Sequence, residues 1–203
     1  LAEVPYVSHY RLALHLVLAF LLFAFCLWYA LDLYKPKKTW MQAPNYRALR
    51  RWLVAIGILI FLQVIWGGYV AGLKAGHMFN TFPTMNGQWL PEQLHAMKPV
   101  LVNYVENPVA VQWTHRVLGT VLGLSVILFW IRLVPMQLER RVVFNATTLL
   151  IAVLAQYLLG IITLLYSVPI SLGVLHQAFA LILWGLWIRL FHQQVRELRP
   201  LSS

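Results

Sequence analysis

In the stretch Tyr104-Val-Glu-Asn-Pro-Val-Ala-Val-Gln-Trp-Thr-His-Arg-Val-Leu-Gly119, a polar loop gives way to a long apolar segment that contains a histidine. Pro108 is favoured in the first turn of a helix, where its missing N–H would be unpaired in any case. A helix that begins there puts His115 about two turns inside, roughly 10 Å along the axis. Because the segment is long enough to span a membrane, an ionisable side chain at this depth is a functional candidate.

The composition is that of a membrane protein. The chain has 203 residues, of which 61% are hydrophobic and only 11% are charged, whereas a soluble domain carries about 25% charged residues. Although the formal net charge is +10, Lys and Arg cluster at the ends of the apolar segments, which indicates membrane orientation and not binding of nucleic acid. The single cysteine, Cys26, cannot form an internal disulfide and is predicted to be a small buried hydrophobic residue.

We therefore expect an all-α membrane protein with five transmembrane helices. The predicted spans are Tyr10–Leu33, Trp52–Leu73, Pro108–Val134, Val142–Tyr166 and Ile170–Phe191. The basic loops at 34–51 and 131–141 are predicted to lie inside. The N-terminus, the long loop 74–108 and the turn 167–171 are then outside, and the C-terminus is inside. The outer loop is a candidate lid over a site, and Gly68, Gly72 and Gly76 predict a close helix–helix contact.

Three intramembrane histidines are predicted to lie at a similar depth below the outer surface: His15, His115 and His176. Each is followed four residues later by a small residue: Ala19, Gly119 and Ala180, respectively. A bare helix face beside an imidazole suits a flat macrocycle with paired axial histidines. A zinc site would lack supporting carboxylates or thiolates. The alternative is that the small residues only permit tight helix packing.

Two arginines are predicted near the same outer level. Arg116 and Arg11 can pair with the carboxylates of a porphyrin, or they can extend to the membrane interface.

An internal repeat gives the expected domain organisation. Ala13-Leu-His-Leu-Val-Leu-Ala19 resembles Val174-Leu-His-Gln-Ala-Phe-Ala180, so the first and fifth spans look like the same helix of a four-helix repeat. Residues 1–33 are then the last helix of a preceding repeat, 34–51 an inner basic loop, and 52–203 a complete C-terminal four-helix bundle with the outer loop 74–108. The chain is expected to be part of something longer, and His15 to be half of a second pair whose partner is absent.

The chain resembles the heme A synthase family of mitochondria and many Gram-negative bacteria. The resemblance covers nearly the whole chain and rests on these motifs: Tyr10-Arg-Leu-Ala-Leu-His15-Leu, Gly67-Gly-Tyr-Val-Ala-Gly-Leu-Lys-Ala-Gly76, Asn80-Thr-Phe-Pro83, Glu106-Asn-Pro-Val-Ala-Val-Gln112 with His115-Arg116, Gln156-Tyr-Leu-Leu-Gly-Ile-Ile-Thr-Leu-Leu165 and Leu175-His176-Gln.

The resemblance implies an eight-helix protein of two four-helix halves that oxidises the C8 methyl of heme O to the formyl of heme A for terminal oxidases. It implies heme b between the axial ligands His115 and His176, with Arg116 nearby, and substrate heme at His15. A catalytic acid is expected in helices that this sequence lacks, because Gln112 stands where the other half has a glutamate and a glutamine cannot handle protons. No catalytic residue is therefore assigned here, and this chain alone is expected to lack part of the catalytic half.

The implied partners are heme O, an electron donor of ferredoxin-like or other type, heme O synthase, a second copy of the chain and the lipid bilayer. The implied location is the bacterial plasma membrane or the mitochondrial inner membrane. Two other classes stay open on the residues alone. One is a bis-histidine b-type cytochrome subunit that transfers electrons and has no use for His15. The other is a transporter whose histidines relay protons and which binds no heme.

Overall fold

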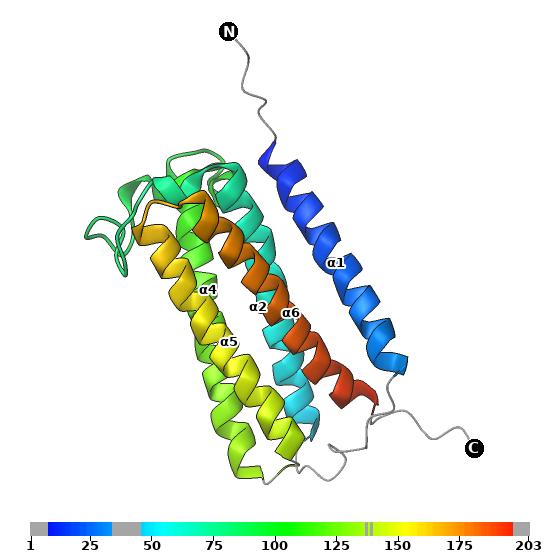
Figure 1. The fold of residues 1–203 in the computed structure, drawn as a ribbon. Coiled ribbons are helices and arrows are strands. Elements are labelled where there is room, and N and C mark those ends of the chain that lie inside the picture. Colours follow the sequence, from blue (N-terminus) through cyan, green and yellow to red (C-terminus); the bar gives the residue numbers. More distant parts are fainter. Residues whose placement is uncertain (1–7, 34–45, 137, 139, 197–203) are drawn as a thin grey trace.

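The computed structural model describes residues 8–33, 46–136, 138 and 140–196, and this part of the chain is almost entirely helical (Figure 1). The elements in chain order are α1 (His9–Leu33), α2 (Tyr46–Gly72), η1 (Ala75–His77), η2 (Glu92–His95), η3 (Val100–Val102), α3 (Asn103–Glu106), α4 (Pro108–Leu133), η4 (Val134–Met136), α5 (Arg140–Leu165) and α6 (Ile170–Arg196). Helices α1, α2, α4, α5 and α6 are long and apolar enough to cross a membrane. The predicted all-α fold with five such helices is confirmed.

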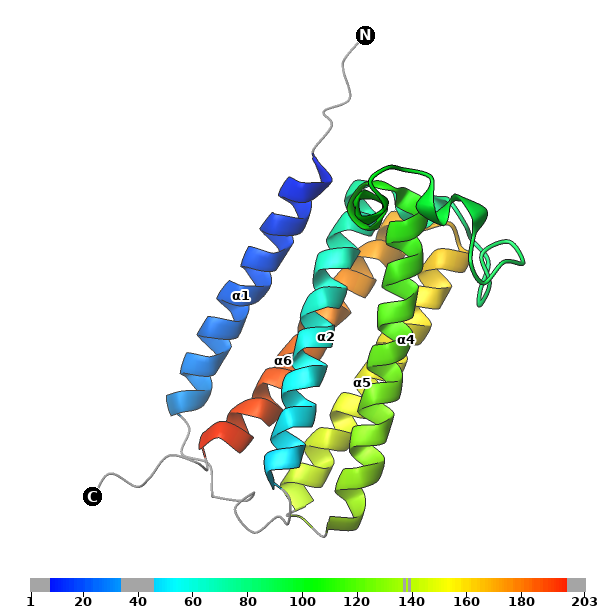
Figure 2. The same cartoon turned by 180° about the vertical axis from the view of Figure 1, so that it is seen from behind.

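Helices α2, α4, α5 and α6 form a four-helix bundle, and α1 packs outside it along α2 and α6 (Figures 1 and 2). The largest core cluster fills the half of the bundle near the start of α2 and the end of α4, with Leu53, Phe129, Leu149 and Ile188 all buried. The opposite half carries the loop between α2 and α4 and most of the polar side chains considered below. In the following, this half is called the outer end and the other the inner end.

Helix α4 begins at Pro108, as predicted from the preference for proline in the first turn of a helix. Asn107 is the N-cap, and its side-chain oxygen accepts a hydrogen bond from the Val109 N–H at 3.0 Å, while Pro108 occupies the first turn. The Asn107 amide also donates to the Gln93 carbonyl at 2.7 Å. One side chain therefore starts the helix and fixes the outer loop to it.

Two expectations differ from the structure. Helix α2 begins at Tyr46 and not at Trp52, so Arg47, Arg50 and Arg51 are helical, because arginine is a good helix former whose long side chain can reach the interface. Cys26 is exposed on α1 and not buried as predicted. The other residues expected in the inner basic loop, 34–45, lie outside the described residues.

The predicted close contact along the glycine series is confirmed between α1 and α2. A Cβ added at Gly68 would lie 2.7 Å from the Ala13 Cα, and one added at Gly72 would lie 2.6 Å from the His9 Cα. Since lipid offers no hydrophobic driving force for helices to associate, close van der Waals contact of backbones is what holds them together.

We expect Gly68→Ala to weaken the packing of α1, because the added methyl meets backbone that no side-chain rotation can move aside. Overpacking of this kind costs about 1–3 kcal/mol, which lowers the midpoint of thermal unfolding in detergent by roughly 3–10 °C. The matched control is Gly185→Ala in α6, where the new Cβ would meet the Phe23 ring of α1 at 3.4 Å, an ordinary contact. Equal midpoints for the two variants would contradict the proposed role of the α1–α2 contact.

Candidate functional site

His115 lies in the outer half of α4, facing α2. Its ring Cε1 is 3.5 Å from where a Cβ of Gly67 would be. Its Nδ1 is buried and has no hydrogen-bond partner in the described part of the chain. A buried ring nitrogen without a partner is unusual in a native structure and needs an explanation.

His176 lies in the outer half of α6, against α5. Its ring covers Gly160, where an added Cβ would come within 2.9 Å of the imidazole. The Gln156 amide donates to the His176 carbonyl at 3.0 Å and lies 3.3 Å from the ring Nε2. The Nδ1 of His176 is buried and also lacks a partner among the described residues.

The two histidines lie at a similar depth in the bundle. The hydroxyls of Thr120 in α4 and Tyr157 in α5 are 2.8 Å apart, which gives a common reference level. His115 is five residues toward the outer end from Thr120, and Gly160, which touches His176, is three residues toward the outer end from Tyr157. At ~1.5 Å per residue, the two imidazoles lie within roughly one helical turn of the same level.

The donor set fits a heme iron, since both histidines are half-buried in one bundle and each keeps a buried ring nitrogen without a partner among the described residues. It does not fit a structural zinc site, because no group of three or more His, Cys, Asp or Glu gathers within the described residues. The helix face at Gly119, which was expected to be bare, is in fact covered by the Gln63 amide and the Tyr157 ring. Around Gly123, nothing lies within 4 Å of an added Cβ.

Arg116 binds the outer loop. Its guanidinium donates to the carbonyls of Phe79 at 2.8 Å and Thr81 at 2.9 Å, with a longer contact to Thr84. One turn earlier, the Gln112 amide donates to the same Phe79 carbonyl at 3.0 Å. Binding of heme carboxylates by Arg116 stays a prediction, and the contacts that the structure gives it are those of a residue that positions the loop.

His15 is not brought to His115 and His176. Ala13 is buried against α2, and a residue two positions later points about 200° around the helix from it. His15 and Ala19 are accordingly exposed on the face of α1 that turns away from the bundle. The substrate-heme role of His15 stays a prediction.

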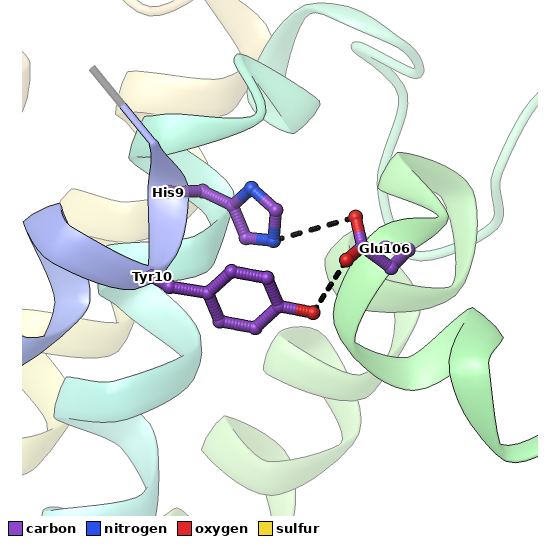
Figure 3. A network of polar contacts seen from close by, with 3 residues as sticks. All are labelled: His9, Tyr10 and Glu106. Carbon is purple, nitrogen blue, oxygen red and sulfur yellow. Dashed lines mark hydrogen bonds and ion pairs between the residues drawn. The ribbon is translucent and has the colours of Figure 1, made fainter.

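A cluster that the sequence reasoning did not single out joins α1 to the outer loop (Figure 3). The Tyr10 hydroxyl donates to Glu106 at 2.5 Å, and the Nε2 of His9, which is buried, lies 3.6 Å from the other carboxylate oxygen (Figure 3). Both Tyr10 and Glu106 stand in motifs that carry the family resemblance, which is the one signal in the sequence that could have drawn attention to them. Their contact spans 96 positions, so no local pattern predicts it.

The fold and site define a helical integral membrane protein with two intramembrane histidines at one depth of a four-helix bundle. Residues 1–188 match the COX15-CtaA family, described as cytochrome oxidase assembly protein. The chain belongs to this family.

The curated relatives carry one name. The chain is 40% identical to a heme A synthase of Nitrosospira multiformis over 93% of this chain and 53% of that protein. It is 45% identical to a heme A synthase of Flavobacterium psychrophilum, over 90% and 53%, respectively. It is 42% identical to heme A synthase COX15 of Bos taurus, over 92% of this chain and 46% of that protein. The chain thus spans about half the length of the curated relatives that it matches.

We expect Arg116→Lys to loosen the outer loop, because one ammonium cannot place two rigid donors on the Phe79 and Thr81 carbonyls. The loop amides of Met85, Asn86 and Gln88, which are hydrogen-bonded within the loop, should exchange with deuterium roughly tenfold faster.

The control for this variant is Arg132→Lys at the inner end, where the guanidinium lies over the Trp52 ring at 5.0 Å. It should leave exchange of the loop amides unchanged. Unchanged exchange in Arg116→Lys would show that these hydrogen bonds do not hold the loop.

Proposed function

We propose that this chain is part of a heme A synthase, an oxidoreductase that converts the C8 methyl of heme O to the formyl of heme A for cytochrome oxidase. Within it, the bundle of α2, α4, α5 and α6 is the half that binds heme b. The observation that carries the proposal is the pair His115 and His176, which are at one depth and each have a buried ring nitrogen without a partner among the described residues. Membership of the family and the shared name of the relatives support it.

In this proposal, His115 and His176 would hold the heme iron, and the heme would supply one-electron transfer. The protein contributes the two imidazoles from facing helices of the bundle. Gln156 fixes the backbone at His176 through its hydrogen bond to that carbonyl. The outer loop, held by Arg116 and Gln112, closes the end of the bundle above the site.

In this proposal, the reaction does not take place in the bundle of α2, α4, α5 and α6. Gln112, one turn before Arg116, is an amide and already donates to the Phe79 carbonyl, so it cannot act as a general acid or base. His15, on the outward face of α1, would bind substrate heme O together with a histidine from helices that this sequence does not contain. The catalytic acid and the contact with the electron donor would lie there too.

The proposed location is the bacterial plasma membrane or the mitochondrial inner membrane. The outer loop and the start of α1 would face outward, because Arg47, Arg50, Arg51, Arg132, Arg140 and Arg141 gather at the opposite end of the helices.

The test is the heme content of the purified chain in detergent, measured as a pyridine hemochrome with a reduced-minus-oxidised spectrum. We expect one b-type heme per chain, lost in His115→Ala and in His176→Ala and retained in His15→Ala. The matched control is His95→Ala, which removes an exposed loop histidine that contacts the Tyr104 hydroxyl and should keep the heme.

Heme that survives in both His115→Ala and His176→Ala would overturn the ligand assignment. If the ligands are as proposed, a bis-histidine b-type cytochrome subunit remains the second candidate. Joining the chain to the missing half of a relative separates the two functions, since a synthase then needs His15 for heme A formation and a cytochrome does not.

A further inference from the structure

The inner end of α2 carries a basic groove that the proposed function does not use. It is lined by Arg47, Arg50, Arg51, Val54, Ala55 and Ile58 and has a volume of about 470 Å³. The three guanidiniums occupy the first two turns of the helix, and all three residues are exposed. The apolar side chains follow directly toward the middle of the membrane.

Within the described part of the chain, the three arginines form no ion pair with a carboxylate. The ion pairs within the described residues are His9 with Glu106 at the outer end and His192 with Asp32 at the inner end. By contrast, Arg132 at the same end lies over the Trp52 ring. Three cations close together at the membrane interface, with no ion pair to a carboxylate of the described residues, favour an anion from outside the chain.

A second groove continues the first one. It has a volume of about 300 Å³ and shares Val54 and Ile58 with the basic groove, and its other lining residues are Gly57, Phe61, Trp187 and Phe191. The wall from α6 is rigid, because the Trp187 and Phe191 rings stack at 5.1 Å and the Trp187 indole donates to the Leu53 carbonyl at 2.8 Å. The continuation is thus a fixed apolar channel between α2 and α6.

The combined groove has the dimensions of one leaflet. From Arg50 to Phe61 the helix advances eleven positions, roughly 16 Å along its axis. Half of the hydrocarbon core of a bilayer is about 15 Å thick. An acyl chain whose headgroup phosphate rests on the arginines would therefore end near Phe61, at the middle of the membrane.

We propose that this groove is a binding site for one anionic phospholipid of the leaflet at the inner end. The phosphate binds Arg47, Arg50 and Arg51, and one acyl chain lies along Val54, Ile58 and Phe61 against the stacked rings of Trp187 and Phe191. The site lies at the end of the bundle opposite to His115 and His176, so it is independent of heme binding.

The test is native mass spectrometry of the purified chain in detergent with equal amounts of phosphatidylglycerol and phosphatidylcholine. We expect one retained lipid, with phosphatidylglycerol preferred. Arg50→Gln/Arg51→Gln should weaken phosphatidylglycerol binding by about fivefold for each charge, hence roughly twenty-five-fold. The matched control is Arg140→Gln/Arg141→Gln, which removes two adjacent exposed arginines from the start of α5 at the same end and should bind the lipid as the unaltered chain does.

Two further arms separate a phospholipid from a free phosphate. Glycerol 3-phosphate in excess should not displace the lipid, and phosphatidylglycerol with six-carbon acyl chains should bind more weakly than with sixteen-carbon chains. The proposal is overturned if the unaltered chain shows no preference for the anionic lipid. That result is expected if a protein segment or a second copy of the chain covers the groove. It is also overturned if both double variants lose binding equally, or if glycerol 3-phosphate competes. The heme spectrum of the variants should stay unchanged, so failure here is distinct from failure of the proposed function.

Discussion

Helix α2 holds the structure together because its neighbours approach it at glycines. Gly68 and Gly72 let the backbone of α1 come into direct contact, Gly67 lies beside the His115 ring of α4, and Gly57 lies under the Trp187 indole of α6. In a membrane, helices are not driven together by burial from water, so short backbone distances and shape determine which helices pair. Three partners are therefore placed by residues of one helix that have no side chain.

The two ends of the bundle contain different kinds of side chain. The inner half is filled by aliphatic and aromatic side chains of the core cluster. The outer half contains amides, histidines and an arginine, and buried polar groups there are costly unless something pairs with them. Several are paired with the outer loop, as Asn107 and Arg116 are. Among the described residues, the Nδ1 atoms of His115 and His176 have no hydrogen-bond partner, and the same holds for the Gln63 and Gln156 carbonyl oxygens near them.

The sequence predicted those features that depend only on residues close together in the chain. Asn107 and Pro108 specify the start of α4, and the length of each apolar segment specifies a span. The exposure of Cys26 could not be predicted, because a membrane helix is apolar on every face and its sequence lacks the period that separates a buried side from an exposed one. The contact of Tyr10 with Glu106 and the three carbonyls around Arg116 depend on the folded course of the loop, which no motif encodes.

The polar side chains that flank His115 bind the outer loop. Gln112 and Arg116 both donate to the Phe79 carbonyl, so one loop atom is held by two successive turns of α4. Groups engaged in this way hold the loop over the end of the bundle. Glu106 joins the same loop to α1 through Tyr10, and α1 carries His15 on its far side. The loop thus contacts both α4, which carries His115, and α1, which carries His15 on the face turned away from the bundle.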